Sequence, residues 1–197
     1  MKKRPEDVFR EHGGQLRMSE AIKHGITRYM LYSLRDKGVI EQVSRGIYRL
    51  VDLPPISNPD LVTVSLRFPN AVICLVSALA YHDITTQIPH AVSVAVPKNS
   101  RTPSLDYPPT LAHKFSNEAY KSGIEEHLID GVPVKVYNSE KTLADCFKFR
   151  NKIGMDVVLE ALKLYKIRKK FDLGKLFKYA KICRVEKVMQ PYLEAML

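Results

Sequence analysis

The pattern of apolar and polar positions predicts three helices and a hairpin in residues 5–51. Pro5, followed by two acidic residues, is typical of a first helical turn, and the glycines at 13 and 14 end that helix. Ser19 is predicted to cap a short second helix that Gly25 closes. Two β-rich runs, 39–43 and 47–51, then predict a hairpin around the turn Ser44-Arg45-Gly46.

The third helix, from Thr27 to about residue 37, carries the most specific pattern in the chain. Thr27 stands at the capping position, and Ile26 and Leu31 occupy the two positions of a hydrophobic staple. At about 100° per residue, the apolar residues 30, 31 and 34 fall on one side of this helix. The polar and aromatic residues fall on the other side, which stays exposed if the apolar side packs on the first two helices.

The order helix, short helix, tight turn, helix, hairpin is typical of a winged helix-turn-helix. In that motif the N-terminal half of the last helix enters the major groove, where arginine suits guanine and tyrosine or threonine reaches phosphates or a thymine methyl. The alternative is an exposed helix and turn whose side chains are simply solvated. We therefore expect double-stranded DNA to be contacted by these residues: Thr27, Arg28, Tyr29, Tyr32, Arg35, Ser44 and Arg45.

A proline-rich polar stretch at residues 54–59 predicts a linker between a domain at 1–53 and a second domain at 60–197. In the second domain, helices are expected at 60–68 and 77–82. Strands are expected at 71–74, 91–96, 111–115, 123–129 and 132–137, and Asp130-Gly131 joins the last two in a hairpin. The pattern then turns helical, at 139–151, 155–166, 172–181 and 186–197, and Pro191 is expected to kink or restart the last helix.

These elements predict the α+β fold class, with an N-terminal winged helix-turn-helix, a mixed α/β domain and a helical C-terminal segment. The net charge of +10 is concentrated at the ends, since residues 1–50 carry 11 Lys/Arg against 6 Asp/Glu and residues 140–197 carry 14 against 7. Clustered cations release counterions from nucleic acid, so a polyanionic partner is one interpretation and a merely soluble basic protein is the other. The residues Lys2, Lys3 and Arg4 form either a basic arm over DNA or a mobile terminus.

A second basic region lies near the C-terminus, where residues 175, 178 and 181 follow one drifting helical stripe. A solvated helix face is the default interpretation of such a stripe, and phosphate contact or an antitoxin surface is the alternative. The residues of this candidate surface are Lys166, Arg168, Lys169, Lys170, Lys175 and Lys178.

Other function classes find little support in the sequence. No window approaches about 18 uncharged apolar residues and no signal peptide begins the chain, so a cytoplasmic protein without membrane contact is expected. Three distant cysteines without CxxC spacing predict reduced thiols, and neither a metal nor a cofactor is expected. His82 and His90 fit no triad or metal spacing, and Cys146 lies among apolar residues typical of a core.

Two alternative functions remain open. The first is a nucleic-acid-processing enzyme such as a nuclease, whose winged domain only delivers the substrate. Asp130 followed by Glu140-Lys141 superficially resembles a nuclease site, but the residue between Glu and Lys is missing and the Asp lies in a turn. The second is an adaptor whose basic C-terminal helices dock an acidic protein. The sequence favours neither over a non-enzymatic DNA-binding protein.

Four segments together resemble the AbiEi-like antitoxins, transcriptional regulators of abortive-infection, type IV toxin–antitoxin systems. They are RGIYRL at 45–50, SALAYHDIT at 77–85, VSVAVPK at 92–98 and VKVYNSEKTLADCFKFRNKIGMDVVLEAL at 134–162. The resemblance covers essentially the full chain, through the order and spacing of these segments. The sequence itself shows neither a toxin nor an operon.

The resemblance implies an N-terminal winged helix-turn-helix that binds inverted repeats in its own promoter and represses the operon. It implies a C-terminal domain that neutralises a nucleotidyltransferase-like toxin without forming a stable complex. By position, Thr27, Arg28, Tyr29, Tyr32 and Arg35 match recognition-helix residues, and Arg45 matches the wing residue. No individual residue of the C-terminal basic surface is implied by the resemblance.

Overall fold

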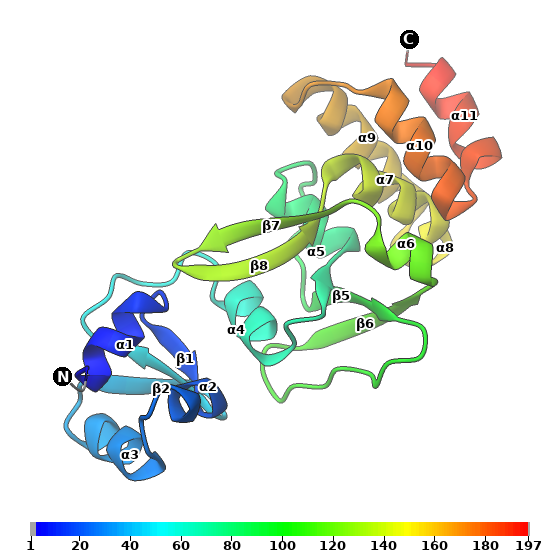
Figure 1. The fold of residues 1–197 in the computed structure, drawn as a ribbon. Coiled ribbons are helices and arrows are strands. Elements are labelled where there is room, and N and C mark those ends of the chain that lie inside the picture. The colour runs from blue at the N-terminus through cyan, green and yellow to red at the C-terminus, as the bar shows by residue number, and fades with distance from the viewer. Residues whose placement is uncertain (1–2, 197) are drawn as a thin grey trace. The chain divides into compact units, whose positions relative to one another are not determined.

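A computed structural model describes residues 3–196 and divides the chain into two compact units (Figure 1). Unit 1 contains the N-terminal residues up to Asn70 together with His127–Val134, and unit 2 contains Ala71–Glu126 together with the residues from Lys135 onward. Residues 60–70, which we predicted to begin the second domain, thus group with the N-terminal elements. The limits predicted for the independently folding domains, 1–53 and 60–197, stay a prediction.

Unit 1 follows the predicted order of helices and hairpin, with one additional strand. Its three-stranded sheet has the order β1-β3-β2 with antiparallel neighbours, so that Leu16 lies opposite Tyr48 and Ile40 opposite Leu50. The elements of this unit are α1 Pro5–Glu11, β1 Gln15–Arg17, α2 Met18–Lys23, α3 Arg28–Asp36, β2 Ile40–Ser44, β3 Ile47–Leu50 and α4 Pro59–Arg67. The tip of a later hairpin, formed by β7 Ile124–Ile129 and β8 Val132–Tyr137, also belongs to this unit.

A single apolar cluster holds the N-terminal elements together. Phe9 of α1, Ala21 of α2 and Leu31 of α3 are completely buried, and they pack with Tyr48 and Leu50 of β3. Each helix thus turns its apolar stripe to the sheet or to another helix, which is the arrangement that the sequence pattern predicted.

The predicted cap of the second helix is wrong. The helix α2 begins at Met18, one residue before Ser19, and its N-cap Arg17 makes no side-chain capping bond. The physical reason is the strand β1, which we did not predict and which ends directly at the helix. The backbone N–H of Met18 donates to the carbonyl of Gly46 at 2.9 Å, so the hairpin supplies the acceptor that a capping side chain would otherwise provide.

Unit 2 holds most of a five-stranded mixed sheet of order β6-β5-β4-β8-β7, of which residues 127–134 belong to unit 1. β4 pairs antiparallel with β5 and parallel with β8, and β5 pairs parallel with β6 from Val92 opposite Thr110 to Pro97 opposite Phe115. The strands are β4 Val72–Ile73, β5 Val92–Pro97, β6 Thr110–Phe115, β7 Ile124–Ile129 and β8 Val132–Tyr137. Asp130 and Gly131 both have positive φ, which confirms the predicted tight turn between β7 and β8.

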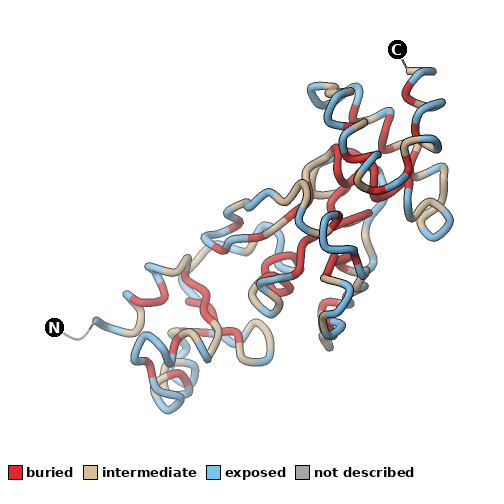
Figure 2. Tube along the Cα trace, turned by 45° about the vertical axis from the view of Figure 1, so that its right-hand side comes forward, coloured by how far each residue is buried: buried red, intermediate tan, exposed pale blue. Residues whose placement is uncertain are grey.

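The helices of unit 2 surround α7, which packs against α5, α9, α10 and α11 (Figure 1). Its side chains from Leu143 to Phe147 are buried, and Figure 2 marks such buried stretches in red. The helices are α5 Leu75–Tyr81, α6 Asn117–Lys121, α7 Ser139–Lys148, α8 Arg150–Ile153, α9 Met155–Arg168, α10 Leu173–Cys183 and α11 Glu186–Glu194. The mixture of helices and sheets confirms the α+β class.

Three details of unit 2 differ from the sequence prediction. The helix expected at 139–151 ends at Lys148, and α8 starts after Phe149. The short helix α6 was not predicted, because its five residues are too few for a periodic pattern. Pro191 lies inside α11, which continues to Glu194, so of the two expected outcomes a restarted helix is wrong.

None of the helices in residues 3–196 combines the length and the apolar character that crossing a bilayer requires.

Candidate nucleic-acid interface

The helix α3 starts where its cap predicts. The side-chain oxygen of Thr27 accepts a hydrogen bond from the backbone N–H of Met30 at 3.2 Å, which satisfies one of the free donors of the first turn. Ile26 and Leu31 on either side of the cap are both buried, so the predicted staple is confirmed. The cap and the staple fix both the start of α3 and its rotation about its own axis.

That rotation leaves the polar face of α3 in solvent. Arg28 is exposed, Tyr29 has 81% of its surface accessible and Tyr32 has 42%. On the opposite face, Leu31 is completely buried and Met30 and Leu34 are packed against the apolar cluster. The predicted division of α3 into an apolar and an exposed face is therefore confirmed.

The exposed face of α3 forms one wall of a hollow of about 650 Å³, which we name the arginine groove. Arg28, Tyr32 and Arg35, which stand one helical turn apart, supply this wall, and Arg45 at the β2–β3 turn supplies another. Tyr29 and Thr27 do not line it. Its lining residues are Arg17, Met18, Ser19, Ile22, Arg28, Tyr32, Arg35, Gln42, Arg45, Gly46, Tyr48 and Arg67.

The charge of the groove is uniform. Five of its lining side chains are arginines, and none of the described residues that line it is acidic. Concave surfaces with one sign of charge focus the electrostatic field and attract the opposite charge. The groove is thus suited to a polyanion, and residues of both a helix and a hairpin turn line it.

Arg35 has two close neighbours within α3. Its Nη2 lies 2.9 Å from Oδ1 of Asp36, and its Cζ lies 5.2 Å from the ring centroid of Tyr32. The hydrogen bond to Asp36 raises the pKa of Arg35, which keeps the guanidinium charged. Because the ion pair is exposed at both ends, its free-energy contribution is small and a stronger anionic ligand can replace Asp36.

The hairpin turn is tighter than predicted. Ser44 is the last residue of β2 and pairs with Ile47, so the turn consists of Arg45 and Gly46. Gly46 has a φ of +73°, a conformation that a residue with Cβ adopts only under strain. Arg45 is exposed at this tip, whereas Ser44 is half-buried.

Eight residues that line the groove were not among the contacts predicted from the sequence: Arg17, Met18, Ser19, Ile22, Gln42, Gly46, Tyr48 and Arg67. Arg17 belongs to the unpredicted strand β1, where its neighbour Leu16 points into the core. Arg67 ends α4, which packs against β1 and β3. An alternation signal over residues 15–17 could have revealed Arg17, but only the tertiary fold brings Arg67 to the groove.

The candidate C-terminal surface is partly engaged within unit 2. Arg168 lies 3.1 Å from a carboxylate oxygen of Asp83 and also donates to its backbone carbonyl. Lys166 donates to the carbonyl of Met196, and Lys175 lies 3.8 Å from Asp172. All six predicted residues are exposed, so they remain accessible to an anionic surface: Lys166, Arg168, Lys169 and Lys170 around the end of α9, and Lys175 and Lys178 on α10.

The N-terminal basic arm is described in part. Lys3 lies 2.7 Å from Glu11 in an exposed ion pair, and Arg4 is exposed at the N-cap of α1. Lys2 lies outside the described residues. The ion pair leaves the arm with less free positive charge than the sequence alone indicates.

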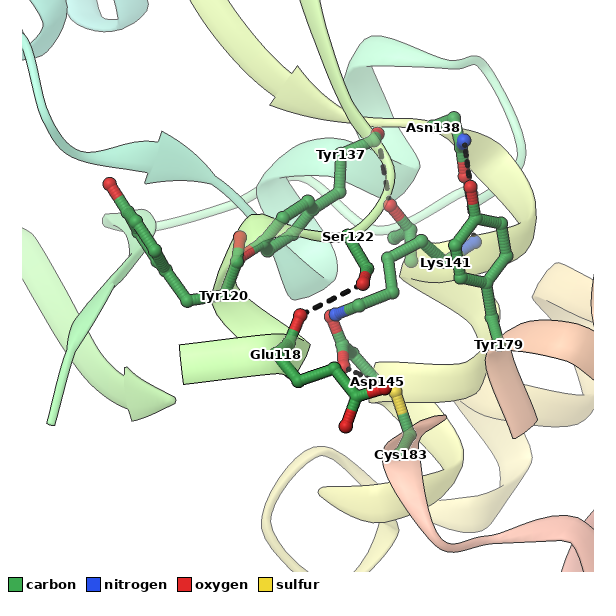
Figure 3. Close-up of polar contacts among 10 residues, drawn as sticks. Glu118, Tyr120, Ser122, Tyr137, Asn138, Lys141, Asp145, Tyr179 and Cys183 are labelled. Atoms are coloured by element: carbon green, nitrogen blue, oxygen red, sulfur yellow. Dashed lines mark hydrogen bonds and ion pairs between the residues drawn. The ribbon is translucent and has the colours of Figure 1, made fainter. Parts of the chain in front are cut away.

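A buried ion pair lies inside unit 2, on α7 (Figure 3). Lys141 and Asp145 are both completely buried and their charged atoms are 2.5 Å apart. The ammonium lies 4.1 Å from the ring centroid of Tyr137, and the thiol of Cys183 donates to Asp145 at 3.2 Å. Burial raises the pKa of Asp145, and the Lys141 charge opposes this effect. With zero exposure at both members, the pair acts as a structural contact and not as a reacting site.

The remaining candidates for chemistry are structural or exposed. The Nε2 of His82 lies 2.7 Å from the carbonyl of Tyr137, and His90 is exposed. Cys146 is completely buried, as predicted, and burial raises the pKa of its thiol. Within residues 3–196, no three His, Cys, Asp or Glu side chains gather in a way that could hold a metal ion.

Comparison with known proteins agrees with the N-terminal geometry. Residues 3–51 match the family described as "Transcriptional regulator, AbiEi antitoxin", which confirms the resemblance predicted from the sequence for this part of the chain. The fold is similar to the crystal structure of the RV2827C protein from Mycobacterium tuberculosis, with a TM-score of 0.57 and 14% identity over 90% of this chain and 69% of that chain. No curated protein matches the chain.

Proposed function

We propose that this chain, whose residues 3–51 match the AbiEi antitoxin regulator family, is a DNA-binding antitoxin that represses its own toxin–antitoxin operon. In this proposal the N-terminal elements form a winged helix-turn-helix, in which α3 is the recognition helix and the β2–β3 hairpin is the wing. One observation carries it: the exposed face of α3 and the tip of the hairpin share a single groove with five arginines. An inverted-repeat operator would take two copies of the chain, one on each half-site.

The proposed roles follow from the geometry of the groove. Arg28 stands at the first residue of α3, the part of a recognition helix that reaches base edges, and its guanidinium suits the O6 and N7 atoms of guanine. Tyr32 and Arg35 continue along the same wall toward the backbone of the duplex. Tyr29, exposed beside the groove, would contact the adjacent strand, and Arg45 would enter the minor groove or bind a phosphate.

The recognition helix is tested by the double substitution Arg28→Ala and Arg35→Ala. We expect footprinting on the upstream region of the gene to lose its protection, because each lost base contact costs about 1–3 kcal/mol. The control is Lys23→Ala with Lys37→Ala, which removes the same charge from exposed residues of unit 1 outside the groove. Unaltered protection in the arginine variant would refute the assignment of α3.

For unit 2 we propose the second half of the function, neutralisation of a nucleotidyltransferase-like toxin without a stable complex. The exposed cations at the end of α9 and on α10 are the proposed surface. Of these, Lys169, Lys170 and Lys178 have no ion pair within the described residues, whereas Arg168 is held by Asp83.

Charge reversal tests this surface. We expect the triple substitution Lys169→Glu, Lys170→Glu and Lys178→Glu to abolish growth rescue from the toxin, because an anionic target would be repelled. The matched control reverses three exposed lysines of unit 2 outside this surface, Lys121, Lys148 and Lys163, and should keep growth rescue. Growth rescue and expression are measured for both variants side by side. Rescue by the triple variant at wild-type level would remove this surface from the antitoxin function.

A further inference from the structure

Two arginines of the groove lie outside both the recognition helix and the hairpin. Arg17 is the last residue of β1, and Arg67 is the last residue of α4. Both line the groove together with Arg28 and Arg45. Arg67 also lies beyond residue 51, where the match to the antitoxin family ends.

One of these two side chains, Arg17, has a buried polar atom that the protein leaves unsatisfied. The Nε of Arg17 is shut off from solvent and has no hydrogen-bond partner within the described residues. Neither guanidinium forms an ion pair in that part of the chain. Burial lowers the pKa of Arg17, and the nearby charge of Arg67 lowers it further, while Glu20 acts in the opposite direction. The fold thus holds two like charges close together, with one donor lacking an acceptor.

An anion between the two arginines would remove both defects. It would supply an acceptor to the buried Nε and screen the repulsion between the guanidinium groups. Phosphate suits this role, because the planar fork of arginine donates two parallel hydrogen bonds to phosphate oxygens. The same chemistry could come from free phosphate or from a phosphodiester in nucleic acid.

The position of the pair selects the phosphodiester. The groove runs between the wall of α3 and the tip of the β2–β3 hairpin. In the proposed function these two elements reach the major groove and the neighbouring minor groove of one duplex, and a sugar–phosphate backbone always separates the two grooves. That backbone has to pass along the groove, which Arg17 and Arg67 also line.

We infer that Arg17 and Arg67 clamp one backbone phosphate of the bound DNA and that α4 is therefore part of the DNA interface. The inference rests on the proposed function and adds to it a contact that fixes register without reading sequence. The DNA-binding part of the chain would then extend beyond residue 51, where the family match ends, to Arg67. The two arginines would set how α3 is positioned in the major groove.

The test substitutes Arg17→Gln and Arg67→Gln in the full chain, together and singly. For the double variant we expect roughly tenfold or more weaker binding to the upstream region and to an unrelated duplex alike, with the ratio of the two affinities unchanged. The slope of log affinity against log salt should become shallower by roughly 0.9, which corresponds to one phosphate. The matched control, Lys23→Gln with Lys37→Gln, should keep the wild-type slope. An unchanged slope in the double variant would overturn the clamp.

A neutral backbone gives a second, independent measurement. Duplexes with a single methylphosphonate placed along each half-site should contain one position that weakens wild-type binding but has no further effect on the double variant. Arg67→Gln alone, at an exposed residue, covers the case in which the change at half-buried Arg17 unfolds the protein. If every methylphosphonate position affects variant and wild type equally, the clamp is refuted.

The possible results distinguish failure of the clamp from failure of the proposed function. If wild-type protein fails to bind its upstream region, the proposed function fails and the clamp with it. If Arg28→Ala with Arg35→Ala loses specific binding while Arg17→Gln with Arg67→Gln changes nothing, the clamp alone fails. If millimolar inorganic phosphate stabilises the wild type but not the Gln variant, and DNA affinity is equal in both, the pair is a free-anion site and the DNA clamp is overturned.

Discussion

At the scale of single residues, Lys141 and Asp145 form an ion pair inside unit 2. Oppositely charged residues four apart are typical of an exposed helix face, where such pairs contribute a few tenths of a kcal/mol. Here both are completely buried among Tyr137, Cys183 and other groups of the unit 2 core. The sequence predicted that α7 begins near this point but gave no reason to place these charges inside, because burial depends on α10 packing over them.

Breaking this pair should be costly. We expect Lys141→Met to lower the free energy of unfolding by about 3–5 kcal/mol, because it leaves an unpaired carboxylate in the core. Adding Asp145→Leu should recover most of the loss, since a pair of apolar side chains avoids burying charge. Urea unfolding of the single and double variants measures both effects.

The comparison needs a control with the same chemical change. Lys175→Met removes an exposed lysine that lies 3.8 Å from Asp172, and it should cost less than about 1 kcal/mol. If Lys141→Met lowered the free energy of unfolding by as little as Lys175→Met does, the buried pair would not be what stabilises unit 2.

At the scale of elements, the sequence predicted best where several local signals agreed. The start of α3 was marked by a cap, a staple and a two-sided pattern, and all three are present at Thr27, Ile26 and Leu31. Short elements without such signals were missed, namely β1 with three residues and α6 with five. The start of α2 was misplaced because a backbone bond from Met18 to Gly46 does the work expected of Ser19.

The residues of the candidate site also fall into those with a local sequence signal and those without one. Arg28, Tyr32, Arg35 and Arg45 could be proposed from local pattern, and the structure brings these four to one groove. Arg17 and Arg67 could not, because they reach the groove only through the pairing of β1 with β3 and the packing of α4 on that sheet. Contacts between segments far apart in the sequence leave no periodic trace in either segment.

The hairpin turn carries a prediction of its own. Arg45→Ala should weaken DNA binding by about 1 kcal/mol or more, because it removes one contact from an exposed tip without disturbing a buried group. Gly46 is left in place, so the turn keeps its positive φ and the hairpin its register. Equilibrium titration of labelled upstream DNA measures the change, and an unchanged affinity would remove the hairpin from the interface.

At the scale of the whole molecule, the two proposed activities lie on different units. The arginine groove is made entirely by unit 1, and the exposed cations of α9 and α10 belong entirely to unit 2. Regulation of an operon and neutralisation of a toxin would then be independent properties of one chain. Because the two activities are assigned to different units, their separate loss can be tested in the full-length protein.

We expect substitutions in one unit to remove only the activity assigned to that unit. Full-length protein with Arg28→Ala and Arg35→Ala should lose repression of a reporter fused to its upstream region and still rescue growth from the toxin. The reversal of Lys169, Lys170 and Lys178 should have the opposite effect, because these residues lie in unit 2 and do not line the groove. If either set removed both activities while circular dichroism showed an intact fold, DNA binding would itself be the means of neutralisation, and the assignment of one activity to each unit would be wrong.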